Sequence, residues 1–573
     1  MRAISNRLWA ITLLLGWIFD FLFWKQQVGL NFVLYLTICL FGGLELLRAG
    51  GFRFARGSLF ILVPFVFFGT ATAVVQEPLT LFLAYAFSLL SLGLLANSYL
   101  GGRWYQYSLR DYLAKFLGLG GSILFLPLDD LKTTSQENAR PRFLIVSVLR
   151  GLTIALPIVI FFALLLSSAD AIFSQTLTDL FNAGKIIEYF ARFLVILLAA
   201  WILAGTFLHA AARSRDETLF SDSSEARKKR LGLTETVIVL GSVAILFLIF
   251  VIIQFQYFFG GETNIGVQGF TYSQYARRGF SELITTAFFS LVLIMSLSAL
   301  TRRDNETQRR LHITMNVVIV AEVTIMLVSA YQRLMLAIDW HGFSRLRLYP
   351  RVFMIWLGVL LAAIVILEIF RRERYFAFAF LLASFGFAAS LVFFNVDVVT
   401  ITHNLEGVRN GKNLNTGHLA SLSTDAIPAL KDAFLDPTFS AELHEGVGAI
   451  LTCYLHSDMM ESSDDWRSFN YSRQRAKRIL TELSPLLETY RFNDKKRPIG
   501  VRFQRRFLFL HGRVRRAERL RNSNSNLIAF ERLCKPSEAI LTEITFLGCR
   551  ERVRGISLLI RPIRVQEKTP RPH

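Results

Sequence analysis

The chain has 573 residues, of which 53% are hydrophobic and 18% charged, and its formal net charge at pH 7 is +20. Soluble globular proteins have about 25% charged residues, so this composition excludes an ordinary soluble protein. The positive charge would suit nucleic-acid binding, but in a membrane protein it is more typical of cytoplasmic loops beside anionic lipid headgroups, and we therefore expect lipid rather than nucleic acid as a partner.

Apolar stretches of roughly membrane-spanning length, about 20 residues each, fill the chain as far as residue 394. Each must be a helix, because lipid cannot satisfy bare backbone groups. The predicted spans are 8–24, 28–47, 59–76, 79–100, 143–168, 187–210, 234–256, 281–301, 313–335, 351–370 and 375–394. The fold class is therefore an all-α membrane protein with about eleven transmembrane helices, followed by a small helical C-terminal region.

Lys and Arg alternate between rich and poor loops along these spans. The rich segments are 2–7, 48–56, 101–142, 213–232, 302–310 and 371–374. The alternate loops are poorer by roughly threefold, and the positive-inside rule then assigns the rich set and the N-terminus to the cytoplasm. An odd number of spans places the C-terminal region outside the cytoplasm.

The longest loop between predicted spans, 101–142, has a further pattern. Aromatic and charged residues recur at helical spacing in RWYQYSLRDYLAKF, residues 103–116. This pattern fits an amphipathic helix lying in the membrane interface, and it fits an ordinary connecting helix equally well.

The part of the chain after the last span divides in two. Residues 395–492 have helical patterning and predict a small helical extramembrane region after the polytopic domain, 1–394. Residues 493–573 form a basic extension, and Lys495–Arg521 alone has eleven Lys or Arg and one acid. A disordered extension is favoured over a phosphate- or lipid-binding arm, and an extension outside the natural reading frame is a third alternative.

Several segments with specific polar motifs follow or precede the spans. They are LLLSSADAIF (164–173), TYSQYARRGFSEL (271–283), WHGFSRLRLYPR (340–351), FFNVDVVTITHNLEGVRNG (393–411), LNTGHLASLSTDAIPAL (414–430) and DWRSFNYSRQRA (465–476). In these segments the chain resembles a family of bacterial multi-pass inner-membrane proteins that is catalogued only as a domain of unknown function. The resemblance extends to about residue 480 and implies a multi-pass protein of the bacterial inner (plasma) membrane. It implies no reaction or ligand.

Signatures of soluble enzymes do not occur in the sequence. There is no Walker A motif, no GxGxxG after a strand, no GxSxG, no HExxH and no EF-hand loop. The sequence therefore favours a non-enzymatic protein without catalytic residues or cofactors. His403 and His418 are conceivable metal ligands, but surface or capping histidines are commoner, so we predict no metal.

Glu322 lies near the middle of a predicted span, so it is the ionisable residue whose position is hardest to explain by proximity to the membrane–water interface. A charge at mid-bilayer costs at least about 2.5–3.5 kcal/mol, so it needs a partner or a hydrated cavity. Candidate partners are Arg150 and Arg192. A buried pair that locks the helices is favoured over a proton or cation relay. Glu368 is expected to pair with Arg372 at the interface.

The predicted topology gathers polar residues of the motif segments at the outer membrane face. These candidate functional residues, to which Glu322 is added, are Asp170, Arg278, Glu282, Asp339, His341, Arg345, Asp397 and His403. A polar vestibule for an ion or small ligand is one interpretation. The favoured interpretation is that the loops bind one another through Arg–carboxylate pairs and aromatic packing, and seat the C-terminal region on the helices.

These observations leave three hypotheses for the function. The first is a non-enzymatic scaffold, sensor or accessory subunit that acts through protein partners. The second is a transporter or channel for an ion or small solute that uses Glu322 and the outer polar residues. The third is a lipid- or envelope-modifying enzyme, which would need titratable groups around a lipid-sized cavity.

Overall fold

The computed structural model describes residues 2–137, 162, 166–167, 170, 184–215, 231–259, 280–301, 305–411, 419–457, 465–488, 492–493 and 497–498. The chain forms two compact units. One consists of Met1–Leu414 with Ser462–Arg478, and the other of Asn415–Glu461 with Ile479–His573. The first unit therefore extends beyond the predicted polytopic domain, 1–394, and includes a segment that follows it by about 70 residues in the sequence.

A first bundle of helices builds the N-terminal half of the first unit. It comprises α1 (Arg2–Phe23), α2 (Leu30–Ala49), η1 (Arg56–Ile61), α3 (Leu62–Thr72), α4 (Pro78–Ser98), η2 (Trp104–Gln106), α5 (Leu109–Glu137) and α8 (Gly184–Ala212). Its core lies between α1, α2 and α8, where Leu8, Leu15, Leu46 and Ala204 are buried. Many other apolar side chains on these helices are exposed, Leu14, Phe41 and Leu198 among them, as expected of helices surrounded by lipid.

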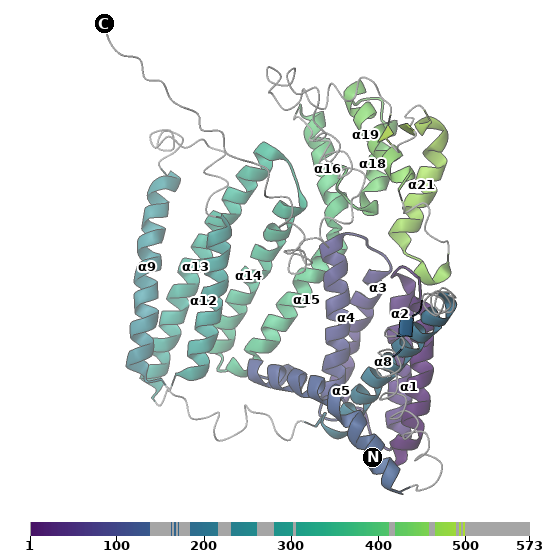
Figure 1. Cartoon of the computed structure of the whole chain (residues 1–573). Helices are drawn as coiled ribbons and strands as arrows, with labels where there is room; N and C mark the ends of the chain where they lie inside the picture. The colour runs from purple at the N-terminus through teal and green to yellow at the C-terminus, as the bar shows by residue number, and fades with distance from the viewer. Residues whose placement is uncertain are drawn as a thin grey trace. The chain divides into compact units, whose positions relative to one another are not determined.

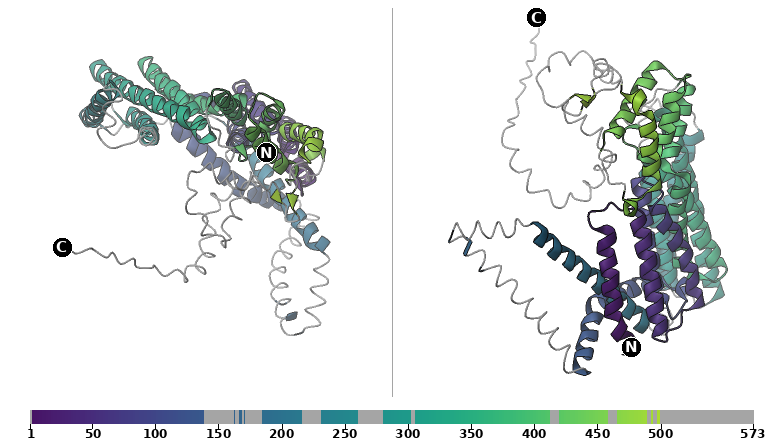
Figure 2. Two further views of the ribbon diagram at one scale, coloured as in Figure 1. Left: turned by 90° about the horizontal axis from the view of Figure 1, so that it is seen from above. Right: turned by 90° about the vertical axis from the view of Figure 1, so that its right-hand side faces the viewer.

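A second bundle follows in the same unit. It comprises α9 (Leu233–Phe259), α12 (Phe280–Leu300), α13 (Glu306–His341), α14 (Arg345–Ile369), η4 (Glu373–Tyr375) and α15 (Phe376–Phe394). Helix α13 packs along α9, α12 and α14 and is the central helix of this bundle (Figure 1). Figure 2, seen from above, shows the second bundle lying beside the first.

The predicted fold class is confirmed, since the described chain is built of helices and many of them suit a membrane. Ten helices in the described residues are long and apolar enough to cross a bilayer. The predicted span 8–24 corresponds to α1, which is not among these ten, and 143–168 lies outside the described residues. One of the ten, Leu109–Leu131 in α5, overlaps the segment 103–116 that was expected to be an interfacial or connecting helix.

Helix α5 differs from the others in direction. Figure 1 shows it lying across the lower ends of α4 and α15 rather than beside them. Leu109, Leu113 and Leu117, which follow one another at helical spacing, are exposed on one face. An apolar face on a crosswise helix is the arrangement of a helix lying in the membrane interface, which is one of the two alternatives that the sequence leaves open.

The helices of the first unit have two common ends, which we name after buried acids. The Glu77 end carries the α3–α4 and α13–α14 connections and the start of α16 (Val396–Arg409). The Glu368 end carries the α12–α13 and α14–α15 connections and η2. The basic loops around Ala55 and Ser214, which belong to the predicted cytoplasmic set, also lie at the Glu368 end. The N–H of Ala55 donates to Tyr99 and the N–H of Leu100 donates to Ser214, and both contacts lie beside η2.

The two bundles of this unit are joined along α15. Phe385 of α15 packs against Phe68 of α3 and Phe87 of α4, with ring centroids 5.6 and 5.1 Å away. At the Glu368 end, Trp104 packs edge-on against Phe378 at 5.4 Å, and Tyr105 stacks on Tyr375 at 6.3 Å. Aromatic pairs prefer such offset and edge-on geometries, so the junction is a specific packing contact.

The second unit is a small helical region. It contains η5 (Thr424–Ala426), α18 (Ile427–Leu435), α19 (Ala441–Leu455) and the last turns of α21 (Tyr471–Leu487). Leu430, Leu451 and Leu480 are buried, and the Tyr454 hydroxyl donates to the carbonyl oxygen of Leu422 at 2.5 Å. The short strands β1 (Phe492–Asn493) and β2 (Arg497–Pro498) pair antiparallel. The rest of the predicted basic extension, 493–573, lies outside the described residues.

Candidate functional site

Glu77 is the N-cap residue of α4 and is buried, with 1% of its surface exposed. Its carboxylate accepts hydrogen bonds from the backbone N–H groups of Leu79 at 3.1 Å and Thr80 at 2.7 Å, and from the Thr80 hydroxyl. The next residue, Pro78, suits the first helical position because its missing N–H is not needed there. The Glu-Pro pair therefore starts the helix and also fixes a carboxylate at its positive end.

Helix α14 places two side chains against this carboxylate from its first turns. The hydroxyl of Tyr349 donates a hydrogen bond to Glu77, and Nε of Arg345 lies 4.0 Å from Oε1 of Glu77. Arg345 and Tyr349 are four residues apart and so share one face of the helix. This contact links the second bundle to the start of α4 in the first bundle.

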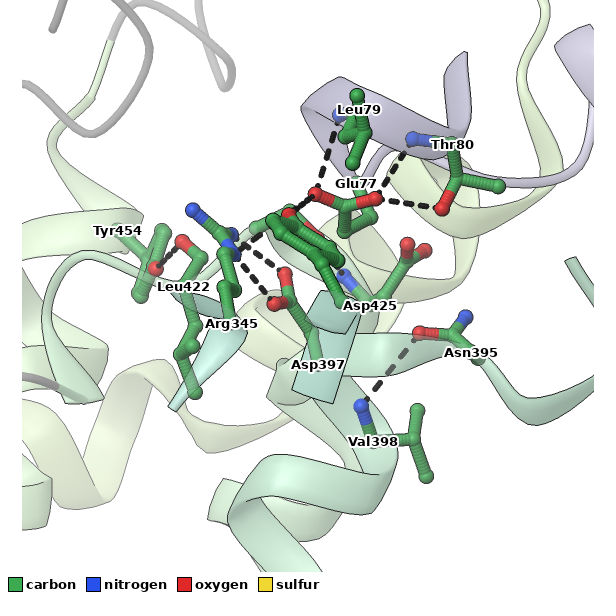
Figure 3. A network of polar contacts seen from close by, with 12 residues as sticks. Glu77, Leu79, Thr80, Arg345, Asn395, Asp397, Val398, Leu422, Asp425 and Tyr454 are labelled. Carbon is green, nitrogen blue, oxygen red and sulfur yellow. Dashed lines mark hydrogen bonds and ion pairs between the residues drawn. The ribbon is translucent and has the colours of Figure 1, made fainter. Parts of the chain in front are cut away.

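Asp397, on the first turn of α16, completes the network and has no exposed surface. Arg345 donates to both of its oxygens, from Nε and from Nη2, each at 2.6 Å. Figure 3 shows the Arg345 side chain between the carboxylates of Glu77 and Asp397. Two-point pairing of this kind fixes both distance and orientation. We call Glu77, Arg345, Tyr349 and Asp397 the outer network, because Arg345 and Asp397 are among the residues predicted for the outer face.

A second contact holds α16 against the α13–α14 connection. The side-chain amide of Asn404 accepts from the backbone N–H of Phe343 at 2.8 Å and donates to its carbonyl oxygen at 3.0 Å. Gly342 has a φ of +75° and allows this approach, because a Cβ there would lie 2.8 Å from the Asn404 side-chain oxygen. The His403 ring stacks on Phe343 with centroids 4.6 Å apart.

The segment before α21 returns to the Glu77 end of the same unit. The carbonyl oxygen of Phe469 accepts from the N–H of Leu30 at 2.8 Å, and the N–H of Tyr471 donates to Ala73 at 2.8 Å. Asn470 donates to the carbonyl oxygens of Thr72 and Val75. This segment, which contains η6 (Trp466–Ser468), therefore ties the α1–α2 connection to the α3–α4 connection.

The charged residues of this segment pair locally. Arg467 donates from Nε to Asp465 at 2.9 Å and from Nη1 to the carbonyl oxygen of Phe21 at 2.6 Å. The hydrogen bond from the guanidinium holds the pKa of the Asp465 carboxyl below its usual value.

The structure brings together only some of the predicted outer residues. Arg345 and Asp397 pair within the outer network, and His403 lies on the neighbouring contact, where it is also 3.1 Å from Glu406. Asp170, Glu282 and Asp339 are exposed, and the Glu282 carboxylate accepts from Ser281. His341 is the last residue of α13, and Arg278 lies outside the described residues.

The predicted partners of the intramembrane acids need correction. Arg192, expected as a candidate partner of Glu322, donates instead to Asp20, with Nη2 2.6 Å from the carboxylate. Arg150 lies outside the described residues. Glu368, expected at the interface with Arg372, is buried and accepts from Asn316 at 2.8 Å, whereas Arg372 is exposed. The spacing argument was wrong for Glu368 because it considered only neighbours on the same helix.

Glu77 and Tyr349 are the members of the outer network that the sequence analysis missed. The signal for Glu77 was the Glu-Pro pair at the start of an apolar run, which is a helix-start pattern. Tyr349 has no signal beyond its spacing from Arg345. Within the described residues, no group of three or more His, Cys, Asp or Glu side chains could hold a metal ion.

The outer network lies within a region that matches a known family. The family described as Domain of unknown function (DUF4153) matches residues 59–433, which contain all four residues of the network and Asn404. The chain belongs to this family. No curated protein and no solved structure matches the chain. The DUF4153 match ends before the segment around Phe469, so this segment lies outside the family region, whereas Ala73, to which Tyr471 donates, lies within it.

Proposed function

We propose that this DUF4153 protein is a non-enzymatic scaffold or sensor subunit of the bacterial inner membrane, which acts through protein partners. The observation that carries the proposal is the position of Arg345, which joins Glu77 at the start of α4 to Asp397 at the start of α16. Helix α16 leads directly from the last apolar helix into the C-terminal part of the chain. A change in the direction of α16 would therefore act, through the Arg345 guanidinium, on the start of α14 and on the start of α4.

The burial of the network favours a coupling role over catalysis. Glu77 and Asp397 have 1% and 0% of their surface exposed, so a substrate could not reach their oxygens. The donors that surround them belong to the protein itself. A general acid or base must lie within hydrogen-bond reach of the group on which it acts, and neither carboxylate meets this condition.

The proposed orientation places the Glu368 end in the cytoplasm and the Glu77 end outside. Support comes from the basic loops, which gather at the Glu368 end and would attract anionic lipids of the inner leaflet. Labelling of Cys453 tests this orientation. The experiment uses intact spheroplasts that contain a variant in which Cys534 and Cys549 are changed to Ser. We expect an impermeant maleimide to label Cys453 before lysis, with denatured protein as the control for thiol burial. Labelling only after lysis would contradict the orientation.

The scaffold proposal predicts that the protein works in an assembly larger than its own 65.2 kDa. Solubilised native membranes, separated by native electrophoresis, should contain the chain in such an assembly. Arg345→Ala should release the chain at its own mass, while Arg371→Ala, which breaks an exposed pair with Glu306, should leave the assembly intact. A wild-type chain that runs at single-chain mass at its native expression level would refute the proposal.

A transporter or channel is the alternative function. The observation in its favour is Glu322, which is buried in α13 and has one carboxyl oxygen without a hydrogen-bond partner among the described residues. This observation concerns the second bundle and is separate from the outer network. Uptake by liposomes that contain the purified chain distinguishes the alternative, because a scaffold moves no solute.

A further inference from the structure

The segment 466–478 is held level with the ends of two apolar helices. It contains η6, the residues after it and the first two turns of α21. The N–H of Ser472 donates to the carbonyl oxygen of Val74 at 3.2 Å, and Val74 is the last residue of a candidate membrane span. Leu30 is the first residue of another candidate span, and its N–H donates to Phe469 at 2.8 Å. The segment therefore lies where the hydrocarbon of the bilayer meets the lipid headgroups.

Three aromatic side chains of this segment are exposed instead of buried. Trp466, Phe469 and Tyr471 have 55%, 42% and 52% of their surface exposed. Phe21, near the end of α1, is also exposed, and the guanidinium of Arg467 lies 5.1 Å from the centre of its ring. Aromatic side chains, Trp and Tyr above all, are enriched at the level of the lipid headgroups. The exposed rings therefore suit contact with a bilayer surface, whereas contact with water would be unfavourable.

The segment also has a strong positive charge. Residues 466–478 read WRSFNYSRQRAKR and include five Lys or Arg and no acid. Arg467 pairs with Asp465, which directly precedes the segment. Three further side chains have no ion pair with any carboxylate of the described residues, and these are Arg473, Arg475 and Arg478. The next acid along the chain, Glu482, pairs with Lys431 at 3.3 Å and does not compensate this charge.

Two of these arginines lie on one exposed face of α21. Tyr471, Arg475 and Arg478 are exposed and follow one another at spacings of four and three residues, so they share one stripe of the helix. By the helical rise, Arg475 is about 6 Å and Arg478 about 10 Å along the axis from Tyr471, which is the greatest height above the membrane level that any tilt allows. The headgroup layer of one leaflet is about 5–8 Å thick. Arg475 therefore lies within that layer, and the long side chain of Arg478 can reach it.

Arg473 is half-buried in the first turn of the same helix. Its Nη1 atom donates to the carbonyl oxygen of Ser468 at 3.3 Å, which is a neutral acceptor. Burial lowers the pKa of the Arg473 guanidinium, because no carboxylate of the described residues offsets the loss of water around it. The first turns of a helix carry a partial positive charge, so cations there are disfavoured unless an anion is near. The segment is therefore complementary to an anion, and lipid phosphate groups are the anions at this depth.

We propose that the segment 466–478 is a binding site for anionic phospholipid headgroups at the Glu77 end of the helices. Arg473, Arg475 and Arg478 bind the phosphate groups, while the exposed aromatic rings lie among the headgroups. The bound lipid holds the segment against the α1–α2 and α3–α4 connections, to which its backbone is hydrogen-bonded. The site is separate from the basic loops of the Glu368 end. It depends neither on the scaffold proposal nor on which end of the helices faces the cytoplasm.

Hydrogen exchange of the full chain in lipid nanodiscs tests the site. One preparation contains phosphatidylcholine alone, and the other contains phosphatidylcholine mixed with phosphatidylglycerol. We expect the amides of 466–478 to exchange at least about threefold more slowly with phosphatidylglycerol, because the bound lipid opposes opening of the segment. The triple variant Arg473→Gln, Arg475→Gln and Arg478→Gln should abolish this difference between the two lipids.

Charge controls separate lipid binding from other effects. Changing the same three arginines to Lys keeps the charge and should keep the difference between the two lipids. The matched control at the Glu368 end is the triple variant Arg371→Gln, Arg372→Gln and Arg374→Gln. It removes as much charge but should leave the difference at 466–478 unchanged. Phosphatidylcholine nanodiscs with inorganic phosphate in the buffer show whether a soluble anion acts in the same way as the lipid.

Equal exchange of the wild-type segment in the two lipids would overturn the proposal. It would also be overturned if inorganic phosphate protects the segment as well as phosphatidylglycerol does, or if the difference persists in the folded variant with Gln at positions 473, 475 and 478. If that variant does not fold, the exposed Arg475→Gln alone decides, because it should reduce the difference. An unchanged difference in folded Arg475→Gln would then contradict the site.

Discussion

Asp397 receives two hydrogen bonds of 2.6 Å from Arg345, although the two residues start different helices and are 52 positions apart in the sequence. Asp397 lies on the first turn of α16, where the helix dipole favours a negative charge. Arg345 lies on the first turn of α14, where the dipole disfavours its own charge, so it depends on the two carboxylates. The direction in which the chain leaves the last apolar helix is therefore set by an ion pair.

Arg345→Ala is expected to be the most destabilising change in the outer network. It leaves Glu77 and Asp397 buried without the guanidinium, and breaking a buried pair in this way costs about 3–5 kcal/mol. Arg345→Lys should lose much of the stability as well, because an ammonium cannot bond both Asp397 oxygens in the planar two-point geometry. Thermal unfolding of the purified variants in detergent measures the loss.

The exposed pair of Arg371 and Glu306 provides the control for Arg345. Its two side chains are 2.7 Å apart but more than half exposed. Solvent screening limits such a pair to about 0–1 kcal/mol, so Arg371→Ala should unfold near the wild-type temperature. Equal unfolding temperatures for Arg345→Ala and Arg371→Ala would contradict the structural importance of the outer network.

Tyr349→Phe removes one hydroxyl group from the network and leaves its ring in place. The hydroxyl donates to the buried Glu77 carboxylate. A hydrogen bond to a charged group contributes about 1.5–3 kcal/mol, so we expect a loss in that range, smaller than for Arg345→Ala. The free energies of unfolding of Tyr349→Phe, Arg345→Ala and the double variant measure the coupling between Tyr349 and Arg345. Simple additivity in that cycle would show that Tyr349 and Arg345 do not act on Glu77 together.

Much of the fold was predictable from the sequence because lipid simplifies the problem. A run of apolar residues about 20 long has only one stable backbone conformation in hydrocarbon, so α2, α4 and α15 follow from composition alone. Alternation of Lys and Arg correctly grouped the loops that share one end. Helix α5 was harder, because its apolar content fits both a span and an interfacial helix, and only its crosswise direction in the structure distinguishes them.

The outer network was only partly predictable, for a physical reason. Arg345 and Asp397 come from segments whose polar residues stand out beside apolar runs, and these could be selected by inspection. Glu77 lies in an otherwise ordinary loop, and its importance depends on Tyr349 approaching from 272 residues away. The pairing of Arg192 with Asp20 and of Glu368 with Asn316 likewise depends on helix packing, which span lengths do not determine.

Gly342→Ala should loosen α16 without touching a charge. The backbone φ of +75° at this position is unfavourable for alanine, and its Cβ would lie 2.8 Å from the side-chain oxygen of Asn404. Strain of this kind costs about 1–3 kcal/mol. Asn404→Ala should have a similar effect, because it removes both hydrogen bonds to Phe343. Hydrogen exchange in α16 measures the change, and unaltered exchange in both variants would show that this contact does not hold the helix.

Gly29→Ala is expected to release the segment that contains Phe469 from the helices of its own unit. A Cβ on residue 29 would lie 2.4 Å from the carbonyl oxygen of Phe469, so one of the two backbones must move. That movement would break the hydrogen bond from Leu30 to Phe469 and should expose the backbone of 466–472. Hydrogen exchange should therefore rise in this segment and in the α1–α2 connection, while the core of α13 keeps its protection. Gly118→Ala is the matched control, because nothing lies within 4 Å of a Cβ there, and it should exchange like the wild type. If the two alanine variants exchange alike, the segment is not held at Gly29.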